Sequence, residues 1–382
     1  MQGWRRSMED AHLALPDFDP ARQLGLFGVF DGHGGAAVSK LAAEMLPDTL
    51  RSLPSFKEGN YEQALRDAFL RLDVYLDSAE GRKRVQQLAE DMPDASDDEA
   101  DQDDEEVIKQ LIASGEVDPT DLDDDDDEDE EDEEEVEPRK SQTKKEASDC
   151  GNSDDDDSDD EDFEMEGEEE EDGEEDEGVA ANKAWANGEG PDGMGTTAVV
   201  ALVRGGEDPE VFCANAGDSR CVLARGAKAV NLSRDHKPTL RSERMRIRKA
   251  GGFVTSEGRV DGNLNLSRAL GDFAYKKDKA LTPFEQKISC EAEVRSQRLG
   301  GSDRYLLLGC DGIFERATSQ ALVDFVLPRL AKHALAGKRL SGVCSSFLDI
   351  NIAKTPAKEQ GLGCDNMTLM VVRLRPVDSS AA

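Results

Sequence analysis

The sequence contains no apolar run long enough to span a membrane, and it lacks the charged-then-apolar N-terminal pattern of a secretion signal. It also lacks a Cys-x-x-Cys pair, and its seven cysteines are odd in number. A disulfide framework usually needs an even set of cysteines in an oxidising compartment, so we expect reduced thiols. These absences favour an intracellular protein that does not contact membranes.

Charge is distributed very unevenly along the 382 residues. The stretch from Asp97 to Glu177 holds 46 acidic and five basic residues, a net charge of −41, whereas the whole chain carries −39. The rest of the chain is therefore close to neutral and long enough for a large core. We expect a disordered acidic insertion, because such a tract buries too little apolar surface to offset its entropy. The expected boundaries are 1–93 and 188–375 for one split domain, 94–187 for the insertion and 376–382 for a tail.

Two interpretations of the acidic tract remain open. It can attract basic proteins over long distances, or it can be a solvated linker that repels itself. Its basic cluster, Arg139-Lys140 with Lys144-Lys145, is a modest nuclear import signal. Ser153 and Ser158 are each followed by acidic residues, the environment that acidophilic kinases prefer.

Three aspartates border runs that are typical of buried β-strands. They are Asp31 after Leu24–Phe30, Asp311 after Tyr305–Cys310, and Asp365 before Met367–Val372. A carboxylate at the end of a buried strand is held rigidly, and its burial is costly unless a cation neutralises it. Oxygen ligands of this kind suit Mg²⁺ or Mn²⁺. The pattern therefore predicts a divalent metal site.

The remaining periodicity indicates an α+β protein with antiparallel sheets. Strand-like runs occur in clusters, and helical patterns lie between the clusters, which does not fit a βαβ repeat. The helices that we expect are one with Val38, Leu41, Ala42, Met45 and Leu46 on one side, and others at Tyr61–Leu88, Leu240–Lys249 and Ser319–His333. The further expected strands are Thr197–Val203, Glu210–Ala214, Arg220–Ala224, Arg304–Cys310 and Met367–Leu374.

Several short motifs, taken in order, resemble those of the metal-dependent Ser/Thr protein phosphatases of type 2C. The gamma subtype, whose catalytic domain an acidic insert interrupts, is particularly similar. The matching strings are Arg5-Arg6-Ser7-Met8-Glu9-Asp10, Asp31-Gly32-His33-Gly34-Gly35, Gly195-Thr196-Thr197-Ala198, Gly217-Asp218-Ser219-Arg220, Asp235-His236-Lys237-Pro238, Asn265-Leu266-Ser267-Arg268-Ala269-Leu270-Gly271-Asp272, Asp311-Gly312 and Asp365-Asn366-Met367-Thr368. The resemblance implies a central antiparallel β-sandwich flanked by helical layers (α-β-β-α).

The resemblance also implies roles for individual residues. Two Mg²⁺ or Mn²⁺ ions would activate a water molecule for in-line attack on phosphorus. Asp31 would bridge both ions and the Gly32 carbonyl would complete one coordination sphere. The other implied ligands are Asp311 and Asp365 at the second ion, and Glu9 and Asp10 mostly through bound water. Arg5 would bind the phosphoryl group, and His33 would protonate the leaving oxygen.

Three features depart from the family pattern. Asp218 resembles the ligand of a third, weaker metal ion, to which Asp272 could contribute, but Glu315 stands where many relatives have Asp. Phe314 likewise replaces the usual Trp. The chain also starts almost at the first motif, so we expect either that it lacks an N-terminal edge strand that relatives carry or that the sequence is truncated there.

The function predicted in this way is the metal-dependent hydrolysis of phosphoserine and phosphothreonine in proteins. We expect basic substrates such as histones or splicing factors, no direct nucleic-acid binding, a monomer, and a nuclear more than a cytoplasmic location. Two alternatives remain: an acidic module that binds histones or RNA-binding proteins with weak or no phosphatase activity, and a hydrolase for small phosphate esters. A hydrolase for small phosphate esters would use the same metal ions, but the order of the motifs in this chain fits the protein phosphatase family.

Overall fold

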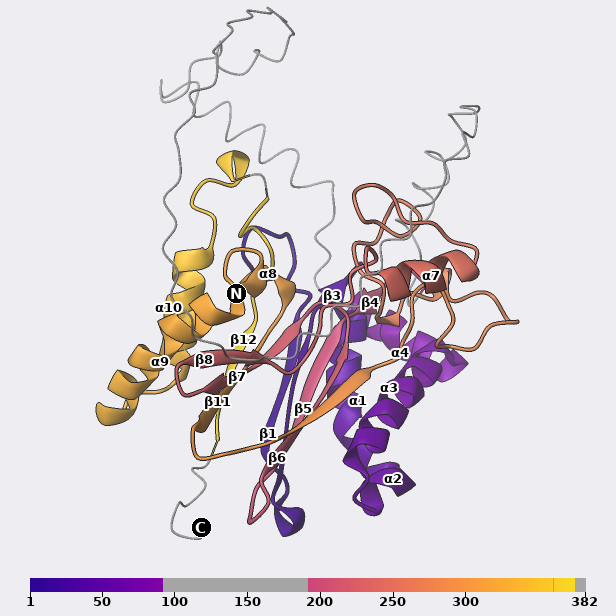
Figure 1. Cartoon of the computed structure of the whole chain (residues 1–382). Coiled ribbons are helices and arrows are strands. Elements are labelled where there is room, and N and C mark those ends of the chain that lie inside the picture. The colour runs from indigo at the N-terminus through magenta and orange to yellow at the C-terminus, as the bar shows by residue number, and fades with distance from the viewer. Residues whose placement is uncertain (92–191, 360, 375–382) are drawn as a thin grey trace, which may run out of the picture. The chain divides into compact units, whose positions relative to one another are not determined.

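A computed structural model describes residues 1–91, 192–359 and 361–374. The described residues form two antiparallel sheets and one small third sheet (Figure 1). The expected acidic insertion lies outside the described residues, so its boundaries stay a prediction. Among the described helices, none combines the length and apolar character that crossing a bilayer would require.

The two large sheets stack as a sandwich. Every strand pair in them is antiparallel, as expected. In spatial order, the first sheet contains β1 (Ala11–Asp19), β2 (Leu24–Phe30), β5 (Ala198–Arg204), β6 (Glu210–Ala216) and β10 (Glu293–Arg298). The second contains β12 (Leu369–Arg373), β11 (Asp303–Gly309), β7 (Arg220–Arg225) and β8 (Lys228–Asn231), and the third β3 (Gly32–His33), β4 (Gly195–Thr196) and β9 (Leu270–Gly271).

Alternating side chains of the first sheet build two separate cores. In β5, Val200 and Leu202 pack with the helices on one face, whereas Val199 and Ala201 pack against the second sheet. Both faces are apolar because each is covered, which explains why β2 and β5 are nearly continuous hydrophobic runs. This arrangement confirms the predicted α-β-β-α layers.

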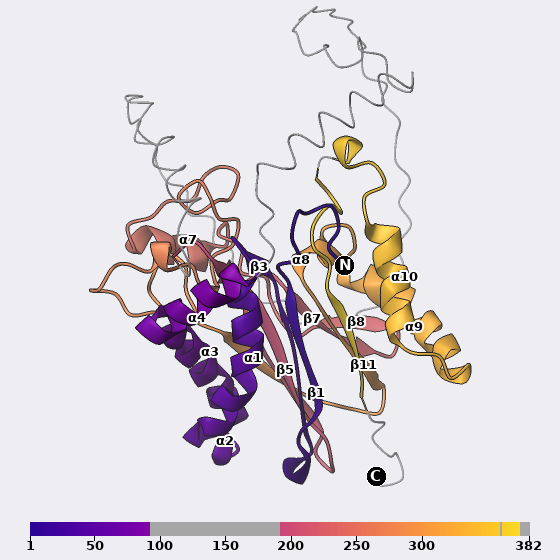
Figure 2. The ribbon, with the colours of Figure 1, turned by 180° about the vertical axis from the view of Figure 1, so that it is seen from behind.

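Helices cover the outer faces of both sheets. In Figures 1 and 2 the helices of the N-terminal region lie on one side of the sandwich, and those near the C-terminus lie on the other. The first group is α1 (Ala37–Ser52), α2 (Pro54–Lys57), α3 (Tyr61–Asp77) and α4 (Ala79–Glu90), and the second is α9 (Ser319–Leu335) and α10 (Ser341–Asn351). Two further helices, α7 (Arg241–Lys249) and α8 (Asp311–Phe314), lie closer to the predicted site.

The single helix predicted for Tyr61–Leu88 is wrong, because the chain breaks at Ser78. Ser78 has an extended backbone (φ −68°, ψ 158°), and its hydroxyl accepts a hydrogen bond from the Gly81 amide at 3.1 Å. A Cβ on Gly81 would lie 2.0 Å from the Tyr75 carbonyl oxygen, so the tight turn requires glycine there. Ser78 thus caps a second helix and ends the first.

Several described elements were not predicted, and the longest of them are β1, β10 and α10. β1 is an edge strand that is mostly half-buried or exposed, contains Pro16, and shifts register between Leu15 and Asp19. Proline and irregular register are tolerated at a sheet edge, but they obscure the period-two pattern. The expected loss of an N-terminal edge strand stays a prediction, and β1 forms one edge of the five-stranded sheet.

Candidate metal centre

Carboxylates from the ends of both sheets meet at one end of the sandwich. Asp31 follows β2 of the first sheet, Asp311 follows β11 of the second, and Asp365 precedes β12. Figure 1 shows β3, which follows Asp31, and α8, which begins at Asp311, at this same end. The sandwich therefore brings together residues that are more than 300 positions apart.

Two groups of potential ligand atoms form within this cluster. Oxygen or sulfur atoms of Asp10, Asp31 and Cys310 lie within 4.8 Å of one another. Atoms of Asp311, Asp365 and Glu315 form a second group with the same spacing. The predicted ligands Asp10, Asp31, Asp311, Asp365 and Glu315 are thus brought together. Glu9 and Asp218 belong to neither group.

The cluster is electrostatically unbalanced. Burial, together with the charges of Asp311 and Asp10, raises the pKa of Asp31 well above its ordinary value. Burial and the nearby Asp218 and Asp365 raise the pKa of Asp311 to about 7, although Lys237 opposes this shift. Like charges that are buried together favour a bound cation or a proton. The chemistry of this group therefore suits a divalent ion.

Asp10 supplies the clearest evidence that the residues fit a metal. Its side chain is only 6 % exposed, and Oδ2 accepts a hydrogen bond from the Thr368 hydroxyl at 2.7 Å. Oδ1 is buried with no hydrogen-bond partner among the described residues. A buried carboxylate oxygen without a donor is costly, and an ion or an ion-bound water would satisfy it.

Cys310 is a hydrogen-bonded neighbour of this group. Its thiol contacts the Asn366 carbonyl at 3.4 Å, and its sulfur accepts a hydrogen bond from the Thr368 amide at 3.1 Å. Burial, reinforced by Asp10 and Asp31, raises the pKa of the Cys310 thiol well above its ordinary value. A protonated thiol is a poor metal ligand and a poor nucleophile.

Gly32 allows two backbone segments to approach closely beside Asp31. A Cβ on Gly32 would lie 2.4 Å from the Glu9 carbonyl oxygen. The Ser39 hydroxyl donates to that same oxygen at 2.5 Å. The Glu9 amide donates to the Asn366 side-chain oxygen at 2.7 Å, so that Glu9 is fixed although it lies outside the two ligand groups.

Arg5 lies at the rim of the cluster. Its guanidinium donates to Asp365 Oδ2 at 2.8 Å, and its side chain is 61 % exposed. The Asn366 side chain holds the preceding segment by donating to the carbonyls of Gln2 and Ser7 at 2.7 and 3.0 Å. An exposed guanidinium that is held over the carboxylates is available to an incoming anion.

His33 is paired with Asp272. The imidazole Nε2 lies 2.9 Å from both carboxylate oxygens. Burial alone would lower the pKa of His33, but the charge and hydrogen bond of Asp272 outweigh it and raise the pKa. Asp272 adopts a left-handed backbone conformation (φ 52°), and its amide donates to the Met194 carbonyl at 2.9 Å. The contact between Asp272 and His33 was not predicted, and the expected contribution of Asp272 to a third metal site stays a prediction.

Asp218 and Glu315, the residues expected at a third metal ion, lie in different surroundings. Asp218 is 2 % exposed and forms an ion pair with Lys237. Glu315 is exposed, and its Oε2 accepts a hydrogen bond from the Gly363 amide at 3.2 Å. Lys237 was part of a recognised motif, but the sequence did not show that it would neutralise Asp218.

The described fold and cluster agree with comparisons to known proteins. The family model described as Protein phosphatase 2C matches residues 1–93 and 125–355. The chain belongs to the protein phosphatase 2C family. It is 36 % identical over 383 residues to "Probable protein phosphatase 2C 60" of Arabidopsis thaliana, with 98 % of this chain and 85 % of that protein covered. It is 32 % identical over 481 residues to "Protein phosphatase 1G" of Mus musculus, with 98 % and 87 % covered.

A solved structure confirms the type 2C fold. A Toxoplasma gondii phosphatase superposes with a TM-score of 0.55 at 20 % identity, over 98 % of this chain and 92 % of that one. Family membership establishes the chain as a metal-dependent protein serine/threonine phosphatase that uses Mg²⁺ or Mn²⁺. The alternative of a binding module without this activity is not favoured.

Proposed function

We propose that Asp31, Asp311 and Asp365 hold the ions of this type 2C phosphatase, with the Gly32 carbonyl, Glu9 and Asp10 completing their surroundings. The raised pKa values of Asp31 and Asp311 and the unpaired Asp10 Oδ1 support this assignment. When bound, the ions neutralise these carboxylates and make a water molecule more acidic. Asp218 and Glu315 would contribute to a third, weaker site.

Arg5 and His33 would act directly on the substrate. Arg5 binds phosphoryl oxygens through its exposed guanidinium while Asp365 fixes its position. Water oxygen bonds to phosphorus as the bond to the Ser or Thr oxygen breaks, and His33 gives that leaving oxygen a proton. A doubly protonated imidazole has one N–H for Asp272 and a second for the substrate, and the raised pKa of His33 favours this form.

The single observation that carries the proposal is the meeting of Asp31 and Asp311 from two different sheets. Phosphate release from a phosphothreonine peptide, with Mn²⁺ and with EDTA, tests the activity directly. We expect turnover only with the metal and no covalent phosphoenzyme. Trapping a phosphorylated Cys, Asp or His would contradict the direct attack of water.

We further propose that residues 94–187 recruit basic phosphoproteins, such as histones or splicing factors, in the nucleus. The charge of −41 between Asp97 and Glu177 supports long-range attraction. A chain without 94–187 should keep its rate on a short neutral phosphopeptide and lose affinity for a basic protein. The higher affinity of the intact chain for the basic protein should also disappear at high salt, because salt screens the charges.

Two results would count against this recruitment. Unchanged affinity of the deleted chain for a basic protein at low salt would show that the tract is a passive linker. Exclusion of the intact chain from nuclei, measured by imaging a fluorescent fusion, would contradict the proposed location. Replacing Arg139, Lys140, Lys144 and Lys145 by Gln tests whether the basic cluster directs import.

A further inference from the structure

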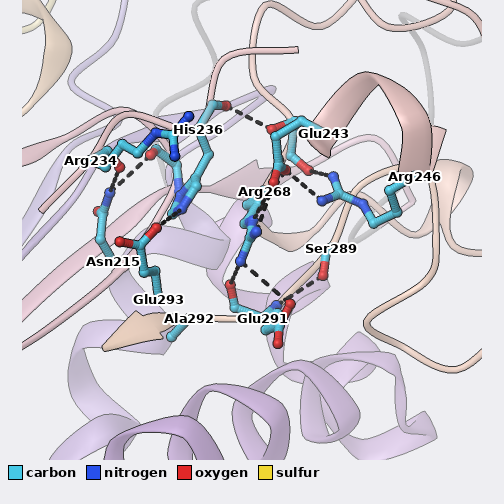
Figure 3. Close-up of polar contacts among 12 residues, drawn as sticks. Asn215, Arg234, His236, Glu243, Arg246, Arg268, Ser289, Glu291, Ala292 and Glu293 are labelled. Atoms are coloured by element: carbon cyan, nitrogen blue, oxygen red, sulfur yellow. Dashed lines mark hydrogen bonds and ion pairs between the residues drawn. The ribbon is translucent and has the colours of Figure 1, made fainter. Parts of the chain in front are cut away.

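Helix α7 is fastened to the body of the phosphatase through a buried carboxylate (Figure 3). Glu243 is 2 % exposed, and its Oε1 accepts a hydrogen bond from Arg268 at 2.7 Å. Its Oε2 accepts from Arg246 at 2.5 Å and from the Ser267 hydroxyl at 2.8 Å. Although burial opposes it, the two arginines lower the pKa of Glu243 to about 2. Both carboxylate oxygens of Glu243 are therefore hydrogen-bonded.

The same two arginines also bind main-chain carbonyls. Arg246 donates to the Ser267 carbonyl at 2.5 Å and to the Gln286 carbonyl at 3.1 Å, and Arg268 donates to the Glu291 carbonyl at 3.0 Å. Arg268 precedes Asp272, the partner of His33, by four residues. Helix α7 is thus tied to the segment that supports the predicted general acid.

The outer face of α7 has the opposite character. Arg241, Arg244, Met245 and Arg248 are exposed, and their spacing of three, four and seven residues places them on one side of the helix. Met245 is 63 % exposed. Within the part of the chain that the structure describes, no side chain forms an ion pair or hydrogen bond with these three guanidinium groups.

Exposed arginines on the other helices behave differently. Arg51 of α1 pairs with Asp48 at 3.0 Å, and Arg84 of α4 pairs with Glu44 at 2.8 Å. An isolated arginine is well solvated, but three adjacent ones repel each other, and no described acid relieves that repulsion. A rigid helix that presents three unpaired arginines around an exposed methionine is ready to bind an acidic partner.

We propose that the outer face of α7, formed by Arg241, Arg244, Met245 and Arg248, binds acidic residues that flank the phosphorylated residue of a protein substrate. The proposal rests on the phosphatase function and concerns only the residues next to the phosphorylated one, whereas residues 94–187 are proposed to attract basic regions elsewhere in a substrate. Arginine forks match carboxylates, and Met245 offers an apolar contact between them. Because Glu243 fixes the helix before substrate arrives, little ordering entropy is lost on binding.

A nucleic acid is the competing ligand for a basic helix. The chain carries a net charge of −39, which opposes a long polyanion with a phosphate at every nucleotide more than it opposes a peptide with a few carboxylates. The link from α7 to Asp272 also ties this face to a site for phosphoproteins. These two points favour the acidic peptide.

The test uses the full-length chain with R241Q, R244Q and R248Q combined. Glutamine keeps helix propensity close to that of arginine, so the melting temperature should stay unchanged. The matched control combines R298Q, R304Q and R373Q, which removes three exposed arginines from β10, β11 and β12. Substrates are phosphothreonine peptides with four acidic residues before or after the phosphothreonine, and a neutral peptide of equal length.

We expect the α7 variant to lose about tenfold in kcat/KM on at least one acidic peptide, since each of three exposed ion pairs contributes a factor of about two. The control variant should retain most of that activity, and the difference should shrink as salt increases. All variants should hydrolyse the neutral peptide equally, which separates this proposal from the phosphatase mechanism. No activity on any peptide would contradict the mechanism instead.

Two outcomes would overturn the docking proposal. In the first, both variants lose equal activity on the acidic peptides, so that only net charge matters. In the second, the α7 variant keeps its activity on acidic peptides but loses binding to a single-stranded RNA oligonucleotide, measured by fluorescence anisotropy. The face would then bind nucleic acid. A selective loss on acidic peptides, with RNA binding absent in every chain, supports the proposal.

Discussion

Glu243 and Asp311 lie in two different regions of this molecule, and their carboxylates have opposite surroundings. Glu243 contacts Arg246 and Arg268, and its pKa is lowered to about 2. Asp311 is surrounded mainly by other aspartates, and its pKa is raised to about 7. Both lose hydration, so the difference comes from their neighbours. One carboxylate is neutralised by the chain itself, whereas the other depends on an added cation.

This contrast separates stability from function. The charge of Glu243 stabilises the folded state, because the arginines interact with it only after folding. The charges of Asp31 and Asp311 destabilise the folded state, since folding gathers like charges in a buried place. A carboxylate that is unsatisfied in the protein alone is the one available to a metal. The following experiments compare the two regions.

The largest effect is expected from Asp31→Asn. Removal of a carboxylate from the metal cluster should lower turnover by several orders of magnitude with Mn²⁺ present. The same change relieves repulsion, so the variant in EDTA should be at least as stable as the wild-type protein in urea denaturation. Asp208→Asn, at an exposed position, is the control. Near-normal turnover of Asp31→Asn would remove Asp31 from the site.

The second prediction concerns His33. His33→Ala should reduce kcat on a phosphothreonine peptide by about a hundredfold or more, the usual range for loss of a general acid. The loss on p-nitrophenyl phosphate should be much smaller, because nitrophenolate leaves without a proton. His12→Ala, an exposed histidine on β1, should affect neither substrate. Equal losses on both substrates would indicate a structural role for His33.

The sequence predicted which carboxylates come together better than it predicted the partners of the other site residues. Asp31, Asp311 and Asp365 were found because each borders a strand, which is a local pattern. The pairing of His33 with Asp272 joins residues 239 positions apart, and the pairing of Asp218 with Lys237 depends on how the segments after β6 and β8 pack. Such contacts are set by tertiary structure and leave no local periodicity.

The same limit explains the errors in the fold. β2 was predicted with its observed bounds because both faces are buried and its sequence is continuously apolar. β1 and β10 were missed because both lie at the edges of their sheet and carry many exposed side chains. The break at Ser78 was missed because the apolar periodicity continues across it. Its capping signal, a serine three residues before Gly81, is easily overlooked.

The third prediction tests the paired region. Glu243→Gln leaves Arg246 without its carboxylate partner and Arg268 with only the more exposed Glu291 at 3.5 Å, which should lower the free energy of unfolding by about 3 kcal/mol. Urea denaturation measures the change. Glu285→Gln, which removes the exposed partner of Lys249, should have little effect. If Glu243→Gln lowered the free energy of unfolding as little as Glu285→Gln, the contacts of Glu243 with Arg246 and Arg268 would not stabilise the fold.

The fourth prediction reverses the comparison by adding the missing cation. Mn²⁺ at about 100 times its Kd should stabilise the wild-type protein by about 2.7 kcal/mol per site and raise its melting temperature. Asp311→Asn should reduce the stabilisation by Mn²⁺. Glu243→Gln should keep this stabilisation, although the variant is less stable than wild type without the ion. Differential scanning calorimetry with Mn²⁺ and with EDTA measures both. An equal gain in wild type and Asp311→Asn would separate Asp311 from metal binding.

The smallest effect is expected in the pH dependence of stability in EDTA, where the two regions act with opposite signs. Glu243 has a lowered pKa, so its contribution is present above the unfolded value of 4.5 and is lost as pH falls toward 2. Asp311 has a raised pKa, so between the unfolded value of 3.8 and about 7 the folded state binds the extra proton and stability falls as pH rises. As the pH falls from 5.5 to 3.5, the free energy of unfolding should therefore decrease by about 1 kcal/mol more for the wild-type protein than for Glu243→Gln. As the pH rises from 5 to 8, the free energy of unfolding should fall more for the wild-type protein than for Asp311→Asn. Mn²⁺ should abolish this difference between wild type and Asp311→Asn, because the ion replaces the proton. Parallel stability curves for wild type and both variants would show that neither carboxylate has the environment described for it.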